Sequence, residues 1–155
     1  NLVHELAKEL KARGLLCATA ESCTGGLISK RITDIAGCSD VYAGGCVTYS
    51  NQLKNKLIGV KTETLEKFGA VSEECAREMA EGVRLTCGSS IGAAVTGVAG
   101  PGGGTPEKPV GLVWCAVSTG DGLTVTKKLT LSGSRDHIRI LSANAVMALI
   151  LQNLE

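Results

Sequence analysis

Residues 20–26, with the sequence AESCTGG, mark a junction between two kinds of secondary structure. The apolar run over residues 15–20 is too short for a helix and predicts a buried strand. From Leu27 onward, apolar side chains recur at helical spacing. A strand followed at once by a helix is typical of α/β sheets, whose ligands gather at the carboxyl ends of the strands. The junction therefore predicts an α/β fold with a candidate site at this point.

Two roles are open for this junction. The first turn of the following helix presents backbone N–H groups and the positive end of the helix dipole, which favour a phosphate or a developing oxyanion. Gly25 and Gly26 let another group approach the backbone closely, Ser22 and Thr24 add hydroxyls, and Glu21 adds a carboxylate. Alternatively, Ser22 or Thr24 only caps the helix. The spacing matches neither a P-loop nor a dinucleotide-binding fingerprint.

Length and charge limit the protein class further. With 155 residues, 44% of them hydrophobic, the chain can fill one core and is too short for two ordinary domains, so we expect one domain over residues 1–155. A net charge of +1, with scattered basic and acidic residues, predicts no nucleic-acid or membrane partner. An aromatic content of 3% leaves too few rings for a stacking platform for single strands.

The cysteine pattern indicates a reducing compartment. Seven cysteines lie in aliphatic stretches without a C-x-x-C pair, which predicts reduced core residues. Only His4 and His137 could join them as metal ligands, so we expect no metal and no other cofactor. No signal peptide opens the chain, and no apolar run approaches the roughly 18 residues of a membrane span. We therefore expect a cytoplasmic protein.

The rest of the chain alternates between helical and strand patterns. Helices are expected over residues 2–13, 27–35, 50–59, 62–68, 73–86 and 134–153, and strands over 15–20, 41–49, 89–96, 110–118 and 123–131. The paired Gly44 and Gly45 predict a bulge or a close backbone approach. The pattern predicts a three-layer α/β/α sandwich with a mixed, mostly parallel central sheet.

Two local details add to this prediction. The segment TGDG at 119–122 predicts a hairpin between the last two strands. In the helix over 73–86, Cys75, Met79, Val83 and Leu85 are expected to face inward.

Three polar loops follow predicted strands, at residues 21–26, 49–54 and 97–108, and their convergence would form a pocket. A serine hydroxyl needs a base, and because no suitable histidine is present, a lysine with a lowered pKa is the remaining candidate. Ser22, Ser39, Tyr49 and Lys54 form such a set, although the sequence does not assign Ser39 to one end of the sheet. The alternatives are a turn former for Ser39, a strand end for Tyr49 and a solvated lysine for Lys54.

Five segments, in order, resemble the CinA C-terminal domain, which is the PncC family of nicotinamide mononucleotide deamidases. They are TAESCTGGLIS at 19–29, TDIAGCS at 33–39, G-x-V-T-Y-S-N at 45–51 with Lys54 following, GAVSE at 69–73, and TGVAGPGGG with EKPVGxV at 96–113. The resemblance covers nearly the whole chain. It does not extend to the N-terminal nucleotide-hydrolysing domain of full-length CinA proteins, which implies either a stand-alone deamidase or the C-terminal part of a longer protein.

The resemblance implies that nicotinamide mononucleotide is hydrolysed to nicotinic acid mononucleotide and ammonia by a metal-independent serine/lysine amidohydrolase. Lys54 would be the base, and Tyr49 would assist or orient the proton transfer. Ser39 is the preferred nucleophile. Ser22 is the second choice, because its place before a helix suits anion binding at least as well as attack.

The resemblance also implies a substrate site. Arg135 would hold the phosphate or the amide, and the other lining residues would be Glu21, Thr24, Gly25, Gly26, Thr96, Gly97 and Gly100. The family often has S-G-I-A-G where this chain has T-G-V-A-G, and Ser-Ser where it has Cys38-Ser39. The expected partner is a small pyridine mononucleotide, and a homo-oligomer is left open. The alternatives are a deamidase of a related amide and a non-catalytic mononucleotide-binding or competence- and damage-linked interaction module.

Overall fold

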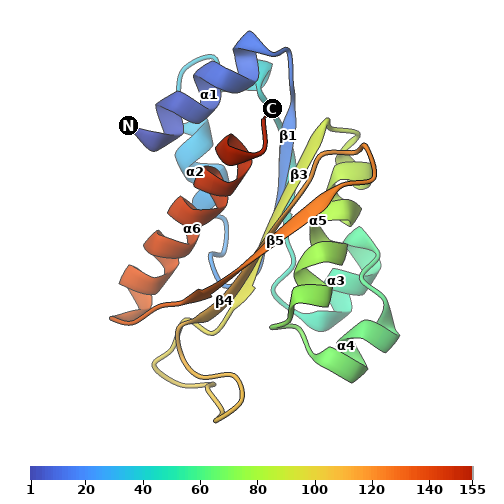
Figure 1. Ribbon diagram of the computed structural model, residues 1–155, viewed down its shortest axis with the longest axis vertical. Helices are drawn as coiled ribbons and strands as arrows, with labels where there is room; N and C mark the ends of the chain where they lie inside the picture. The colour runs from blue at the N-terminus through green and yellow to red at the C-terminus, as the bar shows by residue number, and fades with distance from the viewer. Residues whose placement is uncertain (155) are drawn as a thin grey trace.

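A computed structural model describes residues 1–154, and a five-stranded sheet between two helical layers organises this part of the chain (Figure 1). The helices are α1 (Leu2–Ala12), α2 (Leu27–Thr33), α3 (Asn51–Ile58), α4 (Thr62–Phe68), α5 (Glu73–Cys87) and α6 (Arg135–Gln152), with a 3₁₀ turn at Cys38–Asp40. The strands are β1 (Cys17–Glu21), β2 (Tyr42–Val47), β3 (Ile91–Gly97), β4 (Leu112–Ser118) and β5 (Thr124–Thr130). The predicted α/β fold is confirmed.

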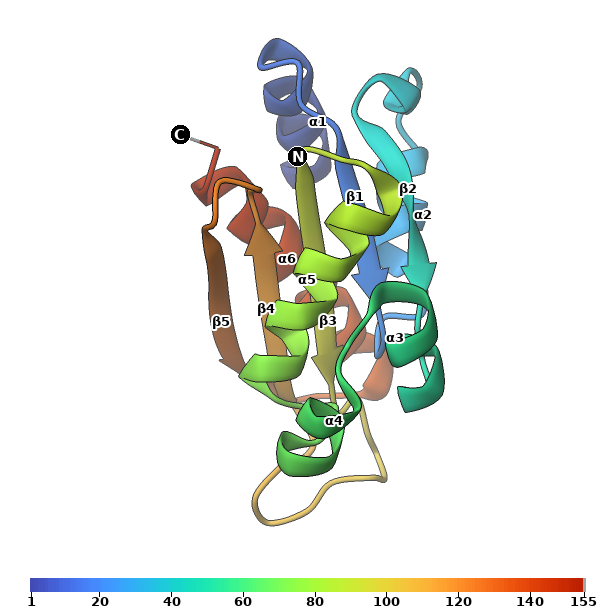
Figure 2. The same cartoon turned by 90° about the vertical axis from the view of Figure 1, so that its right-hand side faces the viewer.

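The sheet has the strand order β2-β1-β3-β4-β5 (Figure 2). β1 pairs in parallel with both β2 and β3, whereas β4 is antiparallel to β3 and to β5. All strands except β4 therefore run in one direction, as the sequence predicted. The carboxyl ends of β1, β2 and β3 meet at one edge of the sheet, where the three polar loops leave it.

Two hydrophobic clusters hold the layers together. α1, α2 and α6 cover one face of the sheet, and α3, α4 and α5 lie on the other (Figure 1). Cys17 of β1 packs in the first cluster, and Ala18 and Ala20 pack in the second. Because side chains alternate along a strand, Glu21 faces the α2 layer and the next residue, Ser22, faces the α5 layer.

Helix ends follow the local sequence signals. The hydroxyls of Ser50, Ser72 and Ser134 each accept a hydrogen bond from a backbone N–H in the first turn of α3, α5 and α6. Gly59 and Gly88 end α3 and α5 in the left-handed conformation. These caps fix where each helix begins and ends, and with them the position of α3 beside the edge of the sheet.

One inward position in α5 was predicted wrongly. Cys75, Met79 and Val83 are buried as expected, but Leu85 is 69% exposed. Leu85 follows Val83 by two residues, which turns it by about 200° around the helix axis and directs it away from the core.

The predicted irregularity of β2 is present. The pairing with β1 shifts between Cys17 and Ala18, whose partners are Tyr42 and Gly44, so one residue of β2 is bulged. At Gly45, a Cβ atom would lie 2.3 Å from the carbonyl oxygen of Thr19, so only glycine fits there. The extra residue is Ala43, and the adjacent Gly44 has a positive φ of 138°, whereas Gly45 is required by the close backbone approach.

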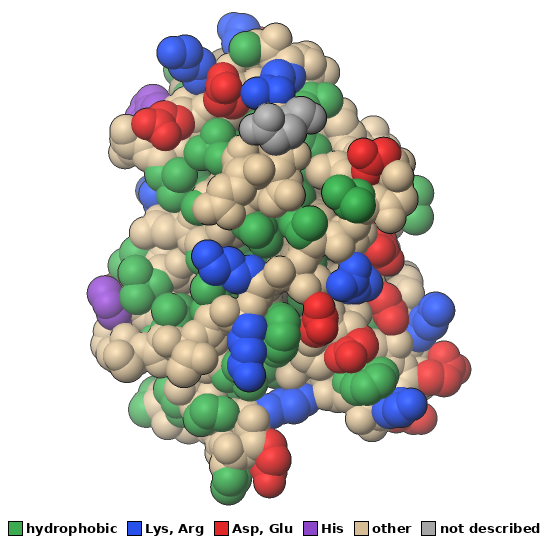
Figure 3. All heavy atoms as spheres, in the orientation of Figure 1, with side chains coloured by type: hydrophobic (Ala, Val, Ile, Leu, Met, Phe, Trp, Pro, Cys, Tyr) green, Lys and Arg blue, Asp and Glu red, His purple; other side chains and the backbone are tan. Residues whose placement is uncertain are grey.

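The surface and the cysteines agree with the composition. Basic and acidic side chains are interspersed on the face seen in Figure 3. All seven cysteines are free thiols, and Cys17, Cys23, Cys75 and Cys115 are buried. Within residues 1–154, no helix combines the length and the apolar character needed to cross a bilayer.

Candidate active site

Lys54 is a buried lysine at the carboxyl edge of the sheet. The capped first turn of α3 places its side chain on the inner face of the helix, where it is only 1% exposed. The Nζ atom donates to the carbonyl oxygens of Thr48 at 2.7 Å and Tyr49 at 3.1 Å. It also lies 3.0 Å from the Oγ atom of Ser22. The amine is thus held by the loop after β2 against the residue that follows β1.

The surroundings of this amine disfavour its charge. No carboxylate forms an ion pair with Lys54 among residues 1–154. Burial lowers the pKa of Lys54 from its usual value of 10.5, and the neighbouring thiols of Cys75 and Cys23 oppose this only in part. Burial raises the pKa of both thiols to about 11, so they are neutral at physiological pH. At a given pH, a larger fraction of Lys54 is therefore neutral than of a solvated lysine.

Ser22 begins a tight turn between β1 and α2. Its N–H donates to Val95 of β3 and its carbonyl accepts from the N–H of Gly25 at 3.0 Å. Ser22 is 8% exposed, so its Oγ atom lies among buried groups, where it contacts Lys54. The N–H groups of Cys23 and Thr24 have no hydrogen-bond acceptor in the described part of the chain. The turn therefore leaves two backbone donors without an acceptor directly after the hydroxyl that faces Lys54, in residues that are 5% (Cys23) and 0% (Thr24) exposed.

The side chain of Glu21 accepts hydrogen bonds from the first turn of α2. Its carboxylate is fully buried and accepts from the N–H groups of Ile28 and Ser29, both at 2.9 Å, and from the hydroxyls of Thr24 and Ser29. The N–H of Leu27 is bonded to the carbonyl of Thr24. The prediction that this helix end presents free N–H groups to a phosphate is therefore wrong, because the chain supplies its own anion. Neither Ser22 nor Thr24 caps α2.

Tyr49 and Arg135 form the outer part of the site. Tyr49 is 60% exposed, and its hydroxyl accepts from a terminal nitrogen of Arg135 at 3.2 Å. The other terminal nitrogen of Arg135 donates to the carbonyl of Gly100 at 2.7 Å. Arg135 thus connects the loop after β2 with the loop after β3. The three loops converge as the sequence predicted, and the hydrogen bonds join Ser22, Lys54, Tyr49, Arg135 and Gly100 in one chain.

The remaining predicted lining residues have packing roles in this structure. Thr96 is 1% exposed and its hydroxyl donates to the carbonyl of Ala70. A Cβ atom at Gly97 would lie 2.6 Å from the side chain of Val113. Gly26 begins α2 with a φ of 105°. Whether Thr96, Gly97 or Gly26 touches a substrate stays a prediction.

Ser39 does not belong to this cluster. It lies in the 3₁₀ turn before β2, whereas Lys54 follows the end of that strand, and the six residues of β2 separate these points by about 20 Å. The neighbouring Asp40 forms an ion pair with Lys11 of α1 at the far edge of the sheet. The structure therefore does not support the preference for Ser39 as the nucleophile served by Lys54 within this chain, and which serine reacts stays a prediction. The hydroxyl that contacts Lys54 is that of Ser22.

Arg139 is a site residue that the sequence reasoning missed. It lies one helical turn after Arg135 on α6, and its guanidinium donates to the carbonyls of Cys23 at 3.1 Å and Thr24 at 3.0 Å. Gly25 makes room for it, because a Cβ atom there would lie 3.2 Å from the guanidinium. The four-residue spacing from Arg135 was the available signal, since such residues share a helix face.

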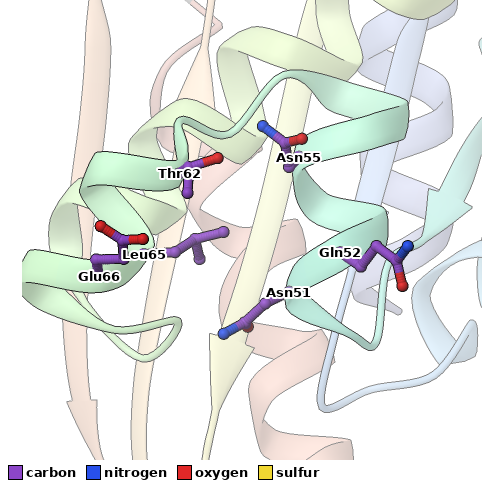
Figure 4. Close-up of a pocket in the computed structure, with 6 residues that line it drawn as sticks. All are labelled: Asn51, Gln52, Asn55, Thr62, Leu65 and Glu66. Carbon is purple, nitrogen blue, oxygen red and sulfur yellow. The ribbon is translucent and has the colours of Figure 1, made fainter.

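The cavity drawn in Figure 4 is separate from this cluster. It has a volume of about 360 Å³ and lies between α3 and α4, on the exposed side of α3. Its lining residues are Asn51, Gln52, Asn55, Thr62, Leu65 and Glu66. Over residues 1–154, no three His, Cys, Asp or Glu side chains gather as a metal-binding group.

The fold and the site define an α/β domain with a buried serine–lysine pair at the carboxyl edge of a mixed sheet. The family model described as the CinA C-terminal domain matches residues 1–154. The chain therefore belongs to the CinA C-terminal domain family, as the resemblance implied.

Relatives and solved structures agree with this assignment. The chain is 55% identical over 130 residues to a CinA-like protein of Kosmotoga olearia, in a match that covers 84% of this chain and 31% of that protein. It thus spans about a third of the length of that relative. The fold is similar to that of the competence/damage inducible protein CihA from Agrobacterium tumefaciens, with a TM-score of 0.92, 41% identity, and coverage of 98% of this chain and 95% of that one. A CinA superfamily protein from Escherichia coli gives a TM-score of 0.94 and 34% identity, covering 98% of this chain and 88% of that one.

Proposed function

We propose that this domain hydrolyses the carboxamide of nicotinamide mononucleotide to nicotinic acid mononucleotide and ammonia, with Ser22 as the nucleophile and Lys54 as the base. Membership of the CinA C-terminal domain family supports the reaction class. The observation that carries the proposal is the contact between the buried Lys54 amine and the Ser22 hydroxyl at 3.0 Å. A solvated surface lysine would have neither the burial nor this partner.

The hydrogen bonds around Lys54 match the needs of a general base. A neutral amine has two N–H groups and one lone pair. The carbonyls of Thr48 and Tyr49 accept hydrogen bonds and cannot donate them, so they take the two N–H groups. In the protonated form Nζ donates to the Ser22 hydroxyl, and in the neutral form the lone pair would face that hydroxyl and accept its proton. This arrangement aims the base at the nucleophile before any substrate arrives.

In the first half of the reaction, the Ser22 proton moves to Lys54 as Oγ attacks the amide carbon of the substrate. The negative charge that develops on the amide oxygen is stabilised by the free N–H groups of Cys23 and Thr24. The Lys54 ammonium then gives its proton to the departing nitrogen. The carbon–nitrogen bond breaks, ammonia leaves, and an ester joins Ser22 to the nicotinoyl group.

In the second half, water replaces ammonia. Lys54, neutral again, takes a proton from the water as its oxygen attacks the ester carbon. The same N–H groups stabilise the second oxyanion. The ester bond breaks, Ser22 recovers its proton from Lys54, and the nicotinate product leaves. All of these steps use groups of this chain and one water molecule.

The outer part of the site suits the mononucleotide. Arg135 is exposed and carries a guanidinium next to the Tyr49 hydroxyl. A guanidinium binds phosphate through paired hydrogen bonds, which supports assigning the 5′-phosphate to Arg135, with the pyridine amide entering toward Ser22. This would make the phosphate a requirement for good turnover.

The test is ammonia release from nicotinamide mononucleotide by the purified chain, with a metal chelator present throughout. Nicotinamide, its riboside and NAD are compared at equal concentrations. We expect turnover with the mononucleotide and loss of turnover in Lys54→Met, while product binding measured by calorimetry persists. Binding by the wild type without ammonia release would instead indicate a mononucleotide-binding module, and preference for the free base would contradict the phosphate site.

A further inference from the structure

A second arginine, Arg139, contacts the turn that carries Ser22 and is not used in the reaction above. Its Nε donates to the carbonyl of Cys23 at 3.1 Å and one terminal nitrogen donates to the carbonyl of Thr24 at 3.0 Å. These are two adjacent peptide units directly after the nucleophile. No carboxylate pairs with Arg139 in residues 1–154. Its charge is therefore directed at the turn alone.

The planarity of the peptide bond gives this contact a consequence. In a trans peptide unit the C=O and N–H groups point in opposite directions. The carbonyl of Cys23 and the N–H of Thr24 belong to the same unit. Because Arg139 draws this carbonyl toward the α6 layer, the N–H of Thr24 is directed away from α6. Lys54 reaches Ser22 from the α5 layer, so this N–H points to the side on which the reaction takes place.

The neighbouring unit is fixed in the same way. Arg139 holds the carbonyl of Thr24, and the N–H of that unit, which belongs to Gly25, donates to the carbonyl of Ser22. The Ser22 carbonyl is thereby turned toward Gly25. The N–H of Cys23 belongs to the same peptide unit as the Ser22 carbonyl, so this N–H is directed away from Gly25. The two N–H groups thus lie in peptide units that the Arg139 guanidinium holds together with two backbone hydrogen bonds, from Gly25 to Ser22 and from Leu27 to Thr24.

We propose that Arg139 is a positioning residue that orients the N–H groups of Cys23 and Thr24 as an oxyanion-binding site for the amide substrate. This inference rests on the proposed function. Arg139 touches neither the nucleophile nor the base, and it acts through the two carbonyls that it holds. Its uncompensated positive charge, behind the peptide units, also favours negative charge in front of them. A lysine at this position would keep the charge but could not match the fixed fork of donors.

The test compares Arg139→Ala and Arg139→Lys with the wild type on nicotinamide mononucleotide and on its thioamide analogue. A developing sulfur anion is larger and accepts weaker hydrogen bonds than an oxyanion, so the ratio of the two kcat values measures the oriented donors. We expect Arg139→Ala to lower kcat for the amide by about 10²-fold, the scale for the loss of an oxyanion donor. KM should change little, and the preference for the amide over the thioamide should fall. The kcat of Arg139→Lys for the amide should lie between those of the wild type and Arg139→Ala.

Arg31 supplies a matched control. It also connects α2 to α6, through the side chain of Asn144, but it does not touch the turn at 22–25. Arg31→Ala should lower the melting temperature while leaving kcat and the amide preference unchanged. If Arg139→Ala does not fold, the comparison between Arg139→Lys and Arg31→Ala decides in its place.

Three results would overturn the inference: unchanged kcat in the Arg139 variants, equal losses for the amide and the thioamide, or the same kinetic loss in Arg31→Ala. A wild type that releases no ammonia would refute the proposed function itself. That failure is visible before any variant is compared, so the two can be told apart.

Discussion

The side-chain nitrogen of Lys54 lies 3.0 Å from the side-chain oxygen of Ser22, although 32 residues separate them in the chain. The contact joins the loops after β1 and β2, which are neighbours in the sheet because β1 and β2 pair in parallel. Burial and the two carbonyl acceptors hold the amine in one orientation. This pair sets the expectations for activity that follow.

The first prediction separates the two candidate nucleophiles. Ser22→Ala should abolish ammonia release, because it removes the hydroxyl that Lys54 contacts. Ser39→Ala should keep activity near the wild-type level, since Ser39 is exposed at the other end of β2. Steady-state kinetics on both variants, with thermal melting to check folding, make the comparison. The reverse result would show that the contact in this chain is not the reacting pair.

The second prediction concerns the pH dependence of activity. Because burial lowers the pKa of Lys54, a larger fraction of the amine is neutral near physiological pH than in a solvated lysine. kcat/KM should fall as the pH drops below this lowered pKa, since the protonated amine cannot accept the serine proton. A profile of kcat/KM against pH measures it. An acid limb centred at the ordinary value of 10.5 would contradict the assignment of Lys54 as base.

The same shift has a stability counterpart. Between the lowered pKa and 10.5, the unfolded chain binds a proton at Lys54 that the folded chain has released. Considered alone, Lys54 should therefore make the free energy of unfolding rise with pH across this interval. This gain in stability should be lost as the pH falls through the pKa of Lys54 in the folded chain. Urea unfolding of wild type and Lys54→Met at several pH values isolates it, because the variant lacks the group. Parallel curves for the two proteins would contradict the shift.

The third prediction concerns the buried carboxylate of Glu21. Glu21→Gln keeps the size of the side chain but sets an NH₂ group against the N–H donors of α2. The loss of acceptors for buried donors should lower the free energy of unfolding by about 1–3 kcal/mol in urea titrations. Glu9→Gln is the control, because Glu9 only pairs with Arg13 at 3.8 Å on the exposed side of α1 and such pairs contribute about 0–1 kcal/mol. Equal effects would mean that Glu21 does not stabilise the junction.

The fourth prediction concerns the tyrosine hydroxyl. Tyr49→Phe removes the acceptor for Arg135 but leaves the carbonyl of residue 49 that holds Lys54. We therefore expect a raised KM for the mononucleotide, with kcat within about threefold of wild type. This modest effect reflects the loss of one exposed hydrogen bond, worth about 0.5–1.5 kcal/mol. A collapse of kcat at unchanged KM would instead indicate that the hydroxyl takes part in proton transfer.

The fifth prediction uses the buried thiols. Burial raises the pKa of Cys17 and Cys115 to about 12 and of Cys23 and Cys75 to about 11, against 9.0 when unburied. Above pH 9.0 the unfolded thiols lose protons that the folded ones keep, so stability should fall as the pH rises toward the folded values. Melting temperatures between pH 8 and pH 11 measure the trend, because this range begins below the unfolded value of 9.0 and ends at the folded value of about 11 for Cys23 and Cys75.

Thiol labelling provides the control for that measurement. In the native protein a thiol reagent should modify only the partly exposed Cys38, Cys46 and Cys87, whereas all seven cysteines should react in urea. Rapid labelling of all seven in the native state would show that the buried set is not protected.

Local patterns predicted the architecture well because the signals for it are local. Ser50 and Gly59 enclose one helix, and Gly44 marks the irregular strand, within a few residues of the structures they specify. The convergence of three loops followed from strand direction, which the order of helices and strands along the chain indicates. The edge of the sheet that holds the site was therefore predictable before any contact was known.

The contacts inside the site were harder to predict, because they depend on residues far apart in sequence. Arg139 reaches carbonyls 115 and 116 residues earlier in the chain. Its four-residue spacing from Arg135 places it on the same helix face but does not indicate which carbonyls it contacts. Glu21 turns back onto the helix that follows it, whereas the sequence suggested a free helix end. Ser39 was left without an assigned edge of the sheet, because a short turn before a strand does not indicate which edge it occupies, and the preference for it as the nucleophile came from the resemblance alone.

The alternation along β1 separates two opposite chemical environments by a single peptide bond. Glu21 lies beneath one helix layer and Ser22 faces the other. Deleting one residue from β1 would exchange the two directions, placing a carboxylate against Lys54. The resulting ion pair would keep the lysine protonated and leave α2 without its anion. The contact between Lys54 and a hydroxyl therefore depends on the alternation of side chains along β1 as much as on which amino acids are present.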